Sequence, residues 1–95
     1  MSEDDVRRVV AIYRESLSSI VPYESANTEA RYPTMMEGLK HARFMCDEID
    51  KILEEPANLD KAFRWLGFLQ AILWTHGIFS IDDMRNHIRA AGHKT

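Results

Sequence analysis

The stretch KAFRWLGFLQAILWTHGIFSIDDMR, residues 61–85, decides the fold of this 95-residue chain. Its first half is apolar on nearly every side of a predicted helix, with Trp65 and Phe68 to one side and Trp74 on the other. A helix that is apolar all round has to be buried all round. Either the chain's own helices cover it or a second copy does, and both interpretations are open at this point.

Outward from this stretch, the hydrophobic spacing predicts four helices and no strand pattern that competes with them. The predicted helices span about residues 3–21, 34–54, 59–76 and 80–91, and a proline-bounded polar loop spans 22–33. The short link between the second and third helices predicts an antiparallel hairpin. We therefore expect a single all-α domain over residues 1–95, a small helical bundle built on a central antiparallel hairpin, with an N-terminal helix and a short C-terminal helix.

Capping-box patterns mark three of the predicted helix starts. In this pattern a serine or threonine is followed three residues later by an acidic residue, and the two satisfy each other's backbone N–H groups. The pairs are Ser2 with Asp5, Thr34 with Glu37, and Ser80 with Asp83.

Composition excludes several classes of protein. The net charge of −3 argues against general nucleic-acid binding, which needs a clustered positive field. The acidic, amphipathic N-terminus is no secretory signal, and no segment approaches the roughly 20 apolar residues of a membrane span. The single cysteine, Cys46, allows no intrachain disulfide and lies on an apolar seam, where a thiol is inert. We expect a cytoplasmic protein without membrane contact.

Metal and catalytic chemistry find little support in the residue spacing. His41 and Cys46 do not share a helix face, and the other histidines are scattered. Asp47 and Asp50 form a D-x-x-D pattern similar to half of the magnesium site of all-α nucleotide pyrophosphohydrolases, but the next helix offers no matching acidic pair. The simpler interpretation is an acidic face turned to solvent. We expect no catalytic residue, metal ligand or cofactor.

A small group of basic, aromatic and polar side chains suggests a pocket for a nucleotide-like anion. Arginine forks match phosphate, and aromatic rings stack on bases. The candidates are Arg31, Tyr32, Arg64, Gln70, Trp74 and His76. Their spacing does not compel them to converge, and in the alternative interpretation Arg64 pairs with Asp60 one helical turn away.

Two sets of residues suggest contacts with other proteins. Phe44 interrupts an otherwise polar stripe of the second predicted helix, so Phe44 and its neighbour Arg43 are candidates for a protein-interaction surface. The third predicted helix offers candidates for packing between copies, because two small residues four apart allow close approach of another backbone. This second set comprises Trp65, Gly67, Phe68 and Ala71.

Residues 35–89 resemble a group of small all-helical proteins of tailed bacteriophages and prophages. The resemblance is carried by HARFMC at 41–46, by RWLGFLQAILW at 64–74, and by the glycine turn and SIDD that follow. Ala71 stands where the family often has glycine. The family has no established activity, so the resemblance implies only an origin, as a phage accessory protein made in a bacterial cytoplasm.

Together these features predict a non-enzymatic phage accessory protein that acts by binding, blocking or diverting a bacterial defence or regulatory protein. The alternative is a protein that sequesters a nucleotide-like anion at an oligomer interface. A magnesium-dependent nucleotide pyrophosphohydrolase is the third interpretation. We expect a homo-oligomer, with a dimer as the first expectation.

Overall fold

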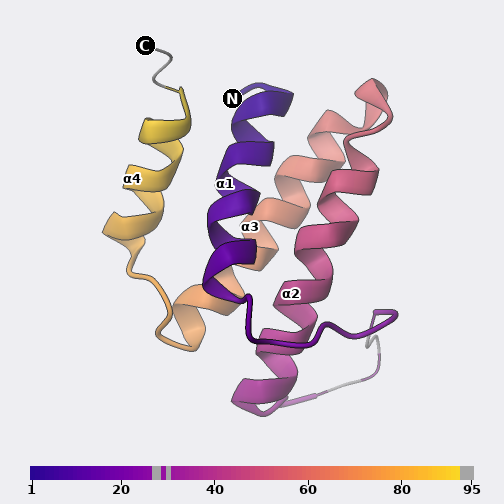
Figure 1. Cartoon of the computed structure of the whole chain (residues 1–95), viewed down its shortest axis with the longest axis vertical. Coiled ribbons are helices and arrows are strands. Elements are labelled where there is room, and N and C mark those ends of the chain that lie inside the picture. The colour runs from indigo at the N-terminus through magenta and orange to yellow at the C-terminus, as the bar shows by residue number, and fades with distance from the viewer. Residues whose placement is uncertain (27–28, 30, 93–95) are drawn as a thin grey trace.

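The computed structural model describes residues 1–26, 29 and 31–92, and within these the chain is all-α (Figure 1). The four helices are α1 (Glu3–Ser16), α2 (Met35–Ile52), α3 (Leu59–Thr75) and α4 (Ile81–Gly92), and a 3-10 turn, η1 (Pro56–Asn58), links α2 to α3. No strand occurs among the described residues. The predicted fold class is therefore confirmed.

The three predicted capping boxes are present. At the start of α1, the Ser2 hydroxyl accepts from the backbone N–H of Asp5, and the Asp5 carboxylate accepts from the backbone N–H of Ser2. At the start of α2, Thr34 and Glu37 exchange the same two hydrogen bonds. At the start of α4, the backbone N–H of Ser80 donates to Asp83 and the N–H of Asp83 donates to the Ser80 hydroxyl. These starts were predictable because a cap depends only on residues three positions apart.

Helix α1 ends at Ser16, five residues before the predicted end at Val21. The Ser16 hydroxyl donates to the carbonyl of Ile12, and the chain then tightens, with the N–H of Ile20 donating to the carbonyl of Leu17. Serine side chains compete for backbone groups in this way and weaken a helix. After the helix ends, Leu17 is still buried, whereas Val21 is exposed.

The helices pack as a hairpin with two further helices on one side. Helices α2 and α3 run antiparallel and make the most extensive contact, and α1 contacts both. Helix α4 packs mainly against α1, so in Figure 1 it lies beside α1 at the edge of the molecule. The outer face of α3 at Arg64, Gly67, Ala71 and Trp74 stays exposed in this arrangement.

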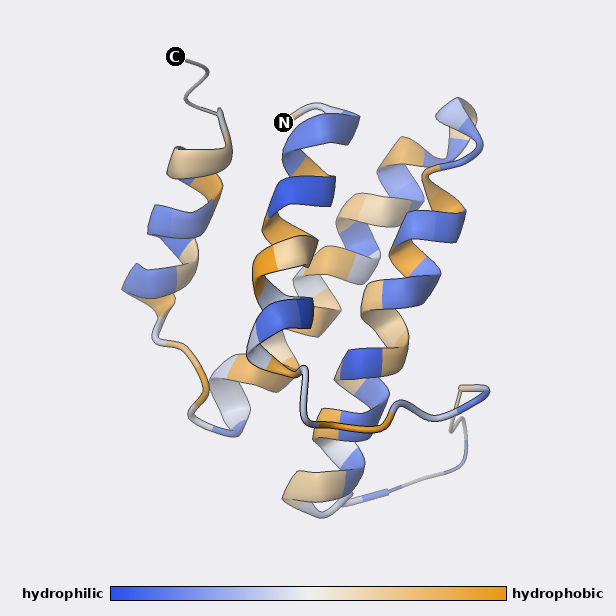
Figure 2. Cartoon of the chain, viewed as in Figure 1, coloured by the Kyte–Doolittle hydropathy of each residue, from blue (hydrophilic) through white to orange (hydrophobic). Residues whose placement is uncertain are grey.

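The core lies between α1, α2 and α3. Its largest fully buried side chains include Tyr13 of α1, Leu17 directly after α1, Ile49 of α2, and Leu69 and Leu73 of α3. In Figure 2, hydrophilic and hydrophobic residues alternate along α1, α2 and α4, as expected for helices with one buried face. None of the helices in the described part of the chain is long and apolar enough to cross a membrane.

Candidate binding surface

The outer face of α3 carries an uncovered row of four residues, Arg64, Gly67, Ala71 and Trp74, here called the α3 crest. All four are exposed, and the Trp74 side chain keeps 54% of its surface accessible. Phe68, beside the crest, keeps 60%. Trp74 on the crest and Phe68 beside it point in different directions, and large apolar side chains this exposed are typical of a contact surface.

Gly67 and Arg64 both lack a partner within the described chain. A Cβ added at Gly67 would meet nothing within 4 Å, although a glycine in a helix interior costs about 1 kcal/mol relative to alanine. Arg64 forms no ion pair with any described residue, so the pairing with Asp60 that was the alternative interpretation is not made. The crest thus has an unpaired guanidinium at Arg64, two small residues at its centre, and an exposed indole at Trp74.

A groove lies beside the crest, between the first half of α2 and the second half of α3. Its volume is about 380 Å³, within the range of small-ligand sites. Apolar groups such as Phe68 and Ile72 form most of its wall, and Glu37, His41, Thr75 and His76 supply the polar groups. We call it the α2–α3 groove.

His76 is held in this groove by the glycine opposite it. A Cβ on Gly38 would lie 2.4 Å from Nε2 of His76, so only glycine lets the imidazole seat against α2. Gly77, with φ at +72°, ends α3 directly after His76 and turns the chain away. The position of His76 therefore depends on both helices of the hairpin, through the missing side chain of Gly38 in α2 and the end of α3 at Gly77.

His41 lines the same groove. Its Nδ1 is buried and has no hydrogen-bond partner among the described residues, and its ring lies 5.8 Å from that of Phe44 and 6.2 Å from that of Phe68. Burial lowers the pKa of His41, which favours the neutral imidazole at pH 7. The groove therefore presents the neutral imidazole of His41 and the carboxylate of Glu37, neither of which attracts an anion.

The six predicted ligand-pocket residues do not converge within one chain. Only His76 lines the α2–α3 groove, and Arg64 and Trp74 lie on the α3 crest. Gln70 is turned inwards, where its amide donates to the Tyr13 hydroxyl at 3.0 Å. Arg31 and Tyr32 are exposed on the loop before α2, and Tyr32 keeps 98% of its surface. The six residues therefore do not form one pocket within a single chain, and a pocket at an interface between copies stays a prediction.

The prediction that Phe44 is an exposed contact residue is also wrong. Phe44 keeps only 8% of its surface, because the chain after α1 crosses α2 near it. The backbone N–H of Tyr23 donates to the carbonyl of Lys40, one turn before Phe44. Arg43 is half-buried, and its guanidinium donates to Asp47 at 2.8 Å. These two residues are therefore structural in this fold.

The four residues predicted to pack between copies have different surroundings. Trp65 is partly buried and packs against the chain's own core. Gly67, Phe68 and Ala71 are exposed, so they remain available for contact with another molecule.

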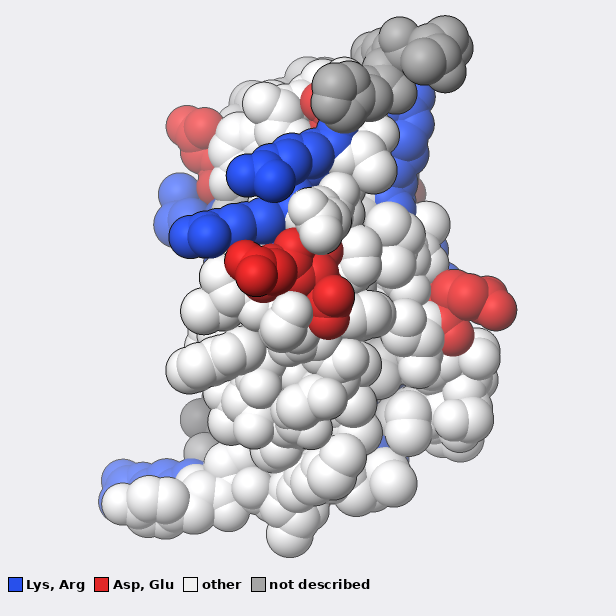
Figure 3. Space-filling model, turned by 90° about the vertical axis from the view of Figure 1, so that its left-hand side faces the viewer, with Lys and Arg blue, Asp and Glu red and all other residues white. Residues whose placement is uncertain are grey.

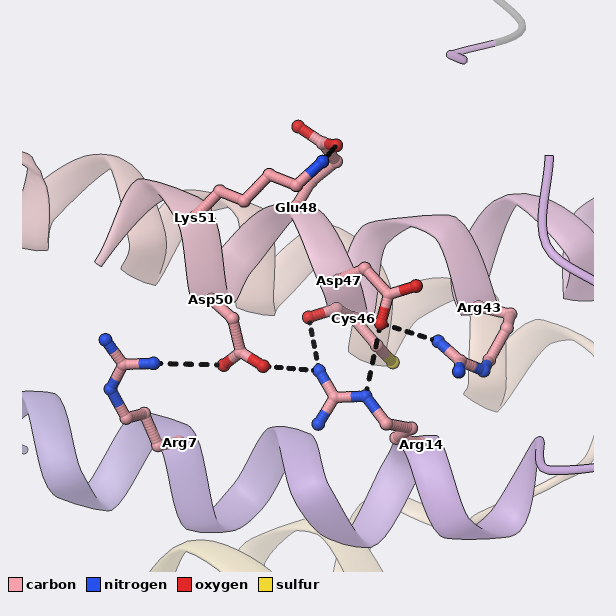
Figure 4. Close-up of polar contacts among 8 residues, drawn as sticks. All are labelled: Arg7, Arg14, Arg43, Cys46, Asp47, Glu48, Asp50 and Lys51. Carbon is pink, nitrogen blue, oxygen red and sulfur yellow. Dashed lines mark hydrogen bonds and ion pairs between the residues drawn. The ribbon is translucent and has the colours of Figure 1, made fainter. Parts of the chain in front are cut away.

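A network of arginines and carboxylates joins α1 to α2, and sequence reasoning missed it (Figure 4). Arg14 donates to Asp47 at 3.2 Å, to the carbonyl of Cys46 at 3.0 Å and to Asp50, whose other oxygen accepts from Arg7 at 3.4 Å. Asp47 and Asp50 therefore do not form a free acidic face turned to solvent, as expected above. The repeated i,i+7 spacing of Arg7 and Arg14 on one face of α1 was the available signal.

The network explains the acidity of Asp47. Burial alone would raise the pKa of its carboxyl, but the hydrogen bonds and charges of Arg43 and Arg14 outweigh burial, so the pKa of Asp47 lies below its usual range. The arginines donate to Oδ1 of Asp47 and to both carboxylate oxygens of Asp50, so these oxygens are already engaged. Among the described residues, no group of three or more His, Cys, Asp or Glu side chains could hold a metal ion.

Charged residues are unevenly distributed over the face formed by α4 and α1. In Figure 3 they gather over the upper part of this face, and the lower part, around the turn from α3 to α4, is largely uncharged.

Comparison with known proteins gave no match to a family model, to a curated protein or to a solved structure. The phage resemblance drawn from residues 35–89 therefore stays a prediction.

Proposed function

We propose that this protein sequesters a nucleotide-like anion at an interface between copies of itself. The observation that carries the proposal is the exposure of Arg64 and Trp74 on one outer face of α3, with Arg64 free of any ion pair to a described residue. An unpaired guanidinium and an accessible indole are the groups that bind a phosphate and a base.

The site needs more than one copy of the chain. Arg64 and Trp74 are ten residues apart, which is about 15 Å along a helix. Within one copy they point outwards from the same surface and enclose nothing. A second copy placed over the crest would provide the other wall of the site and would cover the exposed indole.

The sequence alone favoured capture of a host protein over sequestration of an anion, and the structure favours the reverse. Capture of a host protein depended on Phe44 and Arg43, which are buried and paired respectively. The apolar surface that remains exposed lies on α3, where packing between copies was expected. The proposed role as a phage accessory protein is retained, with a small molecule of the bacterial cytoplasm as its target.

Thermal unfolding and calorimetry with a panel of mono- and dinucleotides, linear and cyclic, test the proposal. A ligand at 100 times its dissociation constant stabilises the folded state by about 2.7 kcal/mol. We expect Arg64→Ala and Trp74→Ala each to remove this stabilisation. Arg89→Ala is the matched control, because Arg89 is also exposed but lies on α4. The absence of any stabilising nucleotide would contradict the proposal.

A second candidate is capture of a host protein at the α2–α3 groove. The observation that favours it is the exposure of Met35 and Met36 at the start of α2, at the same end of the hairpin as Phe68 and Trp74. Flexible methionines are common at surfaces that accept apolar side chains of a partner helix. Replacement of both methionines by glutamine should abolish binding to such a partner, and unchanged binding would exclude this surface.

A further inference from the structure

Gly67 is the feature of the α3 crest that the single chain does not explain. Gly38, the other helix-interior glycine of the hairpin, is required by the imidazole of His76 that rests on it. Above Gly67 there is open space. A glycine in the middle of a helix is destabilising relative to alanine, so the reason for it lies outside this chain.

The crest has a spacing that reads the same from both ends. Arg64 and Gly67 are three residues apart, Gly67 and Ala71 four, and Ala71 and Trp74 three. If a second α3 lies antiparallel with its Ala71 opposite Gly67, then Trp74 of the second copy falls opposite Arg64. The two-fold axis repeats the Gly67–Ala71 pair and the Arg64–Trp74 pair, so each crest residue faces a crest residue of the other copy.

We propose that a second copy of the chain covers the α3 crest in a two-fold, antiparallel contact centred between Gly67 and Ala71. The small residues let the two helix backbones approach closely. At each end, the guanidinium of Arg64 lies over the indole of Trp74 from the other copy, a cation–π pair. Phe68 lies beside the crest and is covered as the two surfaces meet.

Self-complementarity is the reason to choose a second copy over an unrelated protein. An isologous contact requires one surface to present both members of every pair, which the crest does. The position of α4 agrees with this choice, since α4 packs on α1 and leaves α3 open. This contact and the proposed function both require that copies of the chain associate. In the contact, Arg64 of one copy lies against Trp74 of the other at two symmetric places.

Engineered cysteines test the direction of pairing. Arg64→Cys and Trp74→Cys are made separately, purified, mixed and oxidised in air, and products are separated by mass. We expect a disulfide-linked pair of chains in the mixture only. Within either variant alone, the two cysteines of an antiparallel pair are about 15 Å apart, which no disulfide can span. Both replaced side chains are exposed, and the native Cys46 is buried, so the unmodified protein is the blank.

Each other outcome is decisive. Linked chains in either variant alone would mean parallel pairing and would overturn the proposal. Association by mass without any link in the mixture would place the interface elsewhere and would overturn the two-fold antiparallel contact, and the nucleotide panel would still test ligand binding separately. Linkage as expected, together with no nucleotide binding, would overturn only the proposed function.

A second variant tests the flat centre of the contact. Gly67→Gln should fold as a single chain, because the space above residue 67 is open, but its side chain would hold the two helices apart. We expect association to weaken by at least tenfold. Ala90→Gln adds the same side chain on the exposed face of α4 and should leave association unchanged. Equal behaviour of the two variants would overturn the proposal.

Discussion

At the scale of single residues, two glycines in the same hairpin have opposite surroundings. Gly67→Ala should raise the free energy of unfolding of the single chain by about 1 kcal/mol, because alanine is the better helix former and the added Cβ meets nothing. Gly38→Ala should gain less or lose stability, because its Cβ would displace the ring of His76. Urea unfolding of both variants, at concentrations where the mass is that of one chain, measures the difference. Equal gains would contradict the packing of His76 against α2.

Cys46 should resist chemical labelling in the folded protein. Burial raises the pKa of its thiol to about 11, so at pH 8 only about one molecule in a thousand carries the reactive thiolate. A colorimetric disulfide reagent should react slowly without denaturant and rapidly in concentrated urea. Rapid labelling of the folded protein would show that the α2 seam opens readily.

The burial of Cys46 was predicted correctly from the sequence and that of Phe44 was not, and both outcomes have one physical reason. Helical spacing identifies the centre of a buried face, and Cys46 lies at that centre. It does not identify the width of that face. Helix α2 contacts α1 on one side and α3 on the other, and the chain at Tyr23 crosses it as well. Phe44 and Asp47, at the margins, are therefore covered or paired although the pattern placed them in solvent.

At the scale of helices, the arginine–carboxylate network between α1 and α2 should make the free energy of unfolding depend on pH in the acidic range. The folded-state pKa of Asp47 is lowered, so its contribution is complete above the unfolded value of about 3.9 and is lost as the pH falls through the folded value. We expect the free energy of unfolding to fall below about pH 4, and Asp47→Asn to reduce that fall. Glu54→Gln, at an exposed position after α2, serves as the control.

Urea unfolding at several pH values between about 2 and 6 measures this dependence. Several of these side chains are partly exposed, so each ion pair contributes modestly, and the difference between the two variants is the informative quantity. A pH dependence that Asp47→Asn leaves unchanged would contradict the assignment of Asp47 to the network.

Helix boundaries were predictable where they depend on neighbouring residues. The capping boxes at Ser2, Thr34 and Ser80 and the stop at Gly77 are local signals, and all are present. The end of α1 was not predictable from Pro22, because the serine at 16 bonds its own helix backbone and the chain turns earlier.

At the scale of the whole molecule, spacing predicts which face of a helix is buried but not which neighbour covers it. The α2–α3 hairpin followed from the short link at residues 53–58. The docking of α4 on α1 depends on long-range contacts, such as Tyr13 with Phe79 and His87, which no local pattern encodes. That docking is what leaves the α3 crest exposed, so the candidate surface could be suspected from the sequence but not located.

The measurement that tests the central claim most directly is the mass of the unmodified protein in solution, by light scattering over a dilution series. A two-fold contact through the α3 crest predicts an even number of 11.0 kDa chains at high concentration, and a lower mass for Gly67→Gln at the same concentration. A mass of one chain at every concentration, or of an odd number of chains, would contradict it.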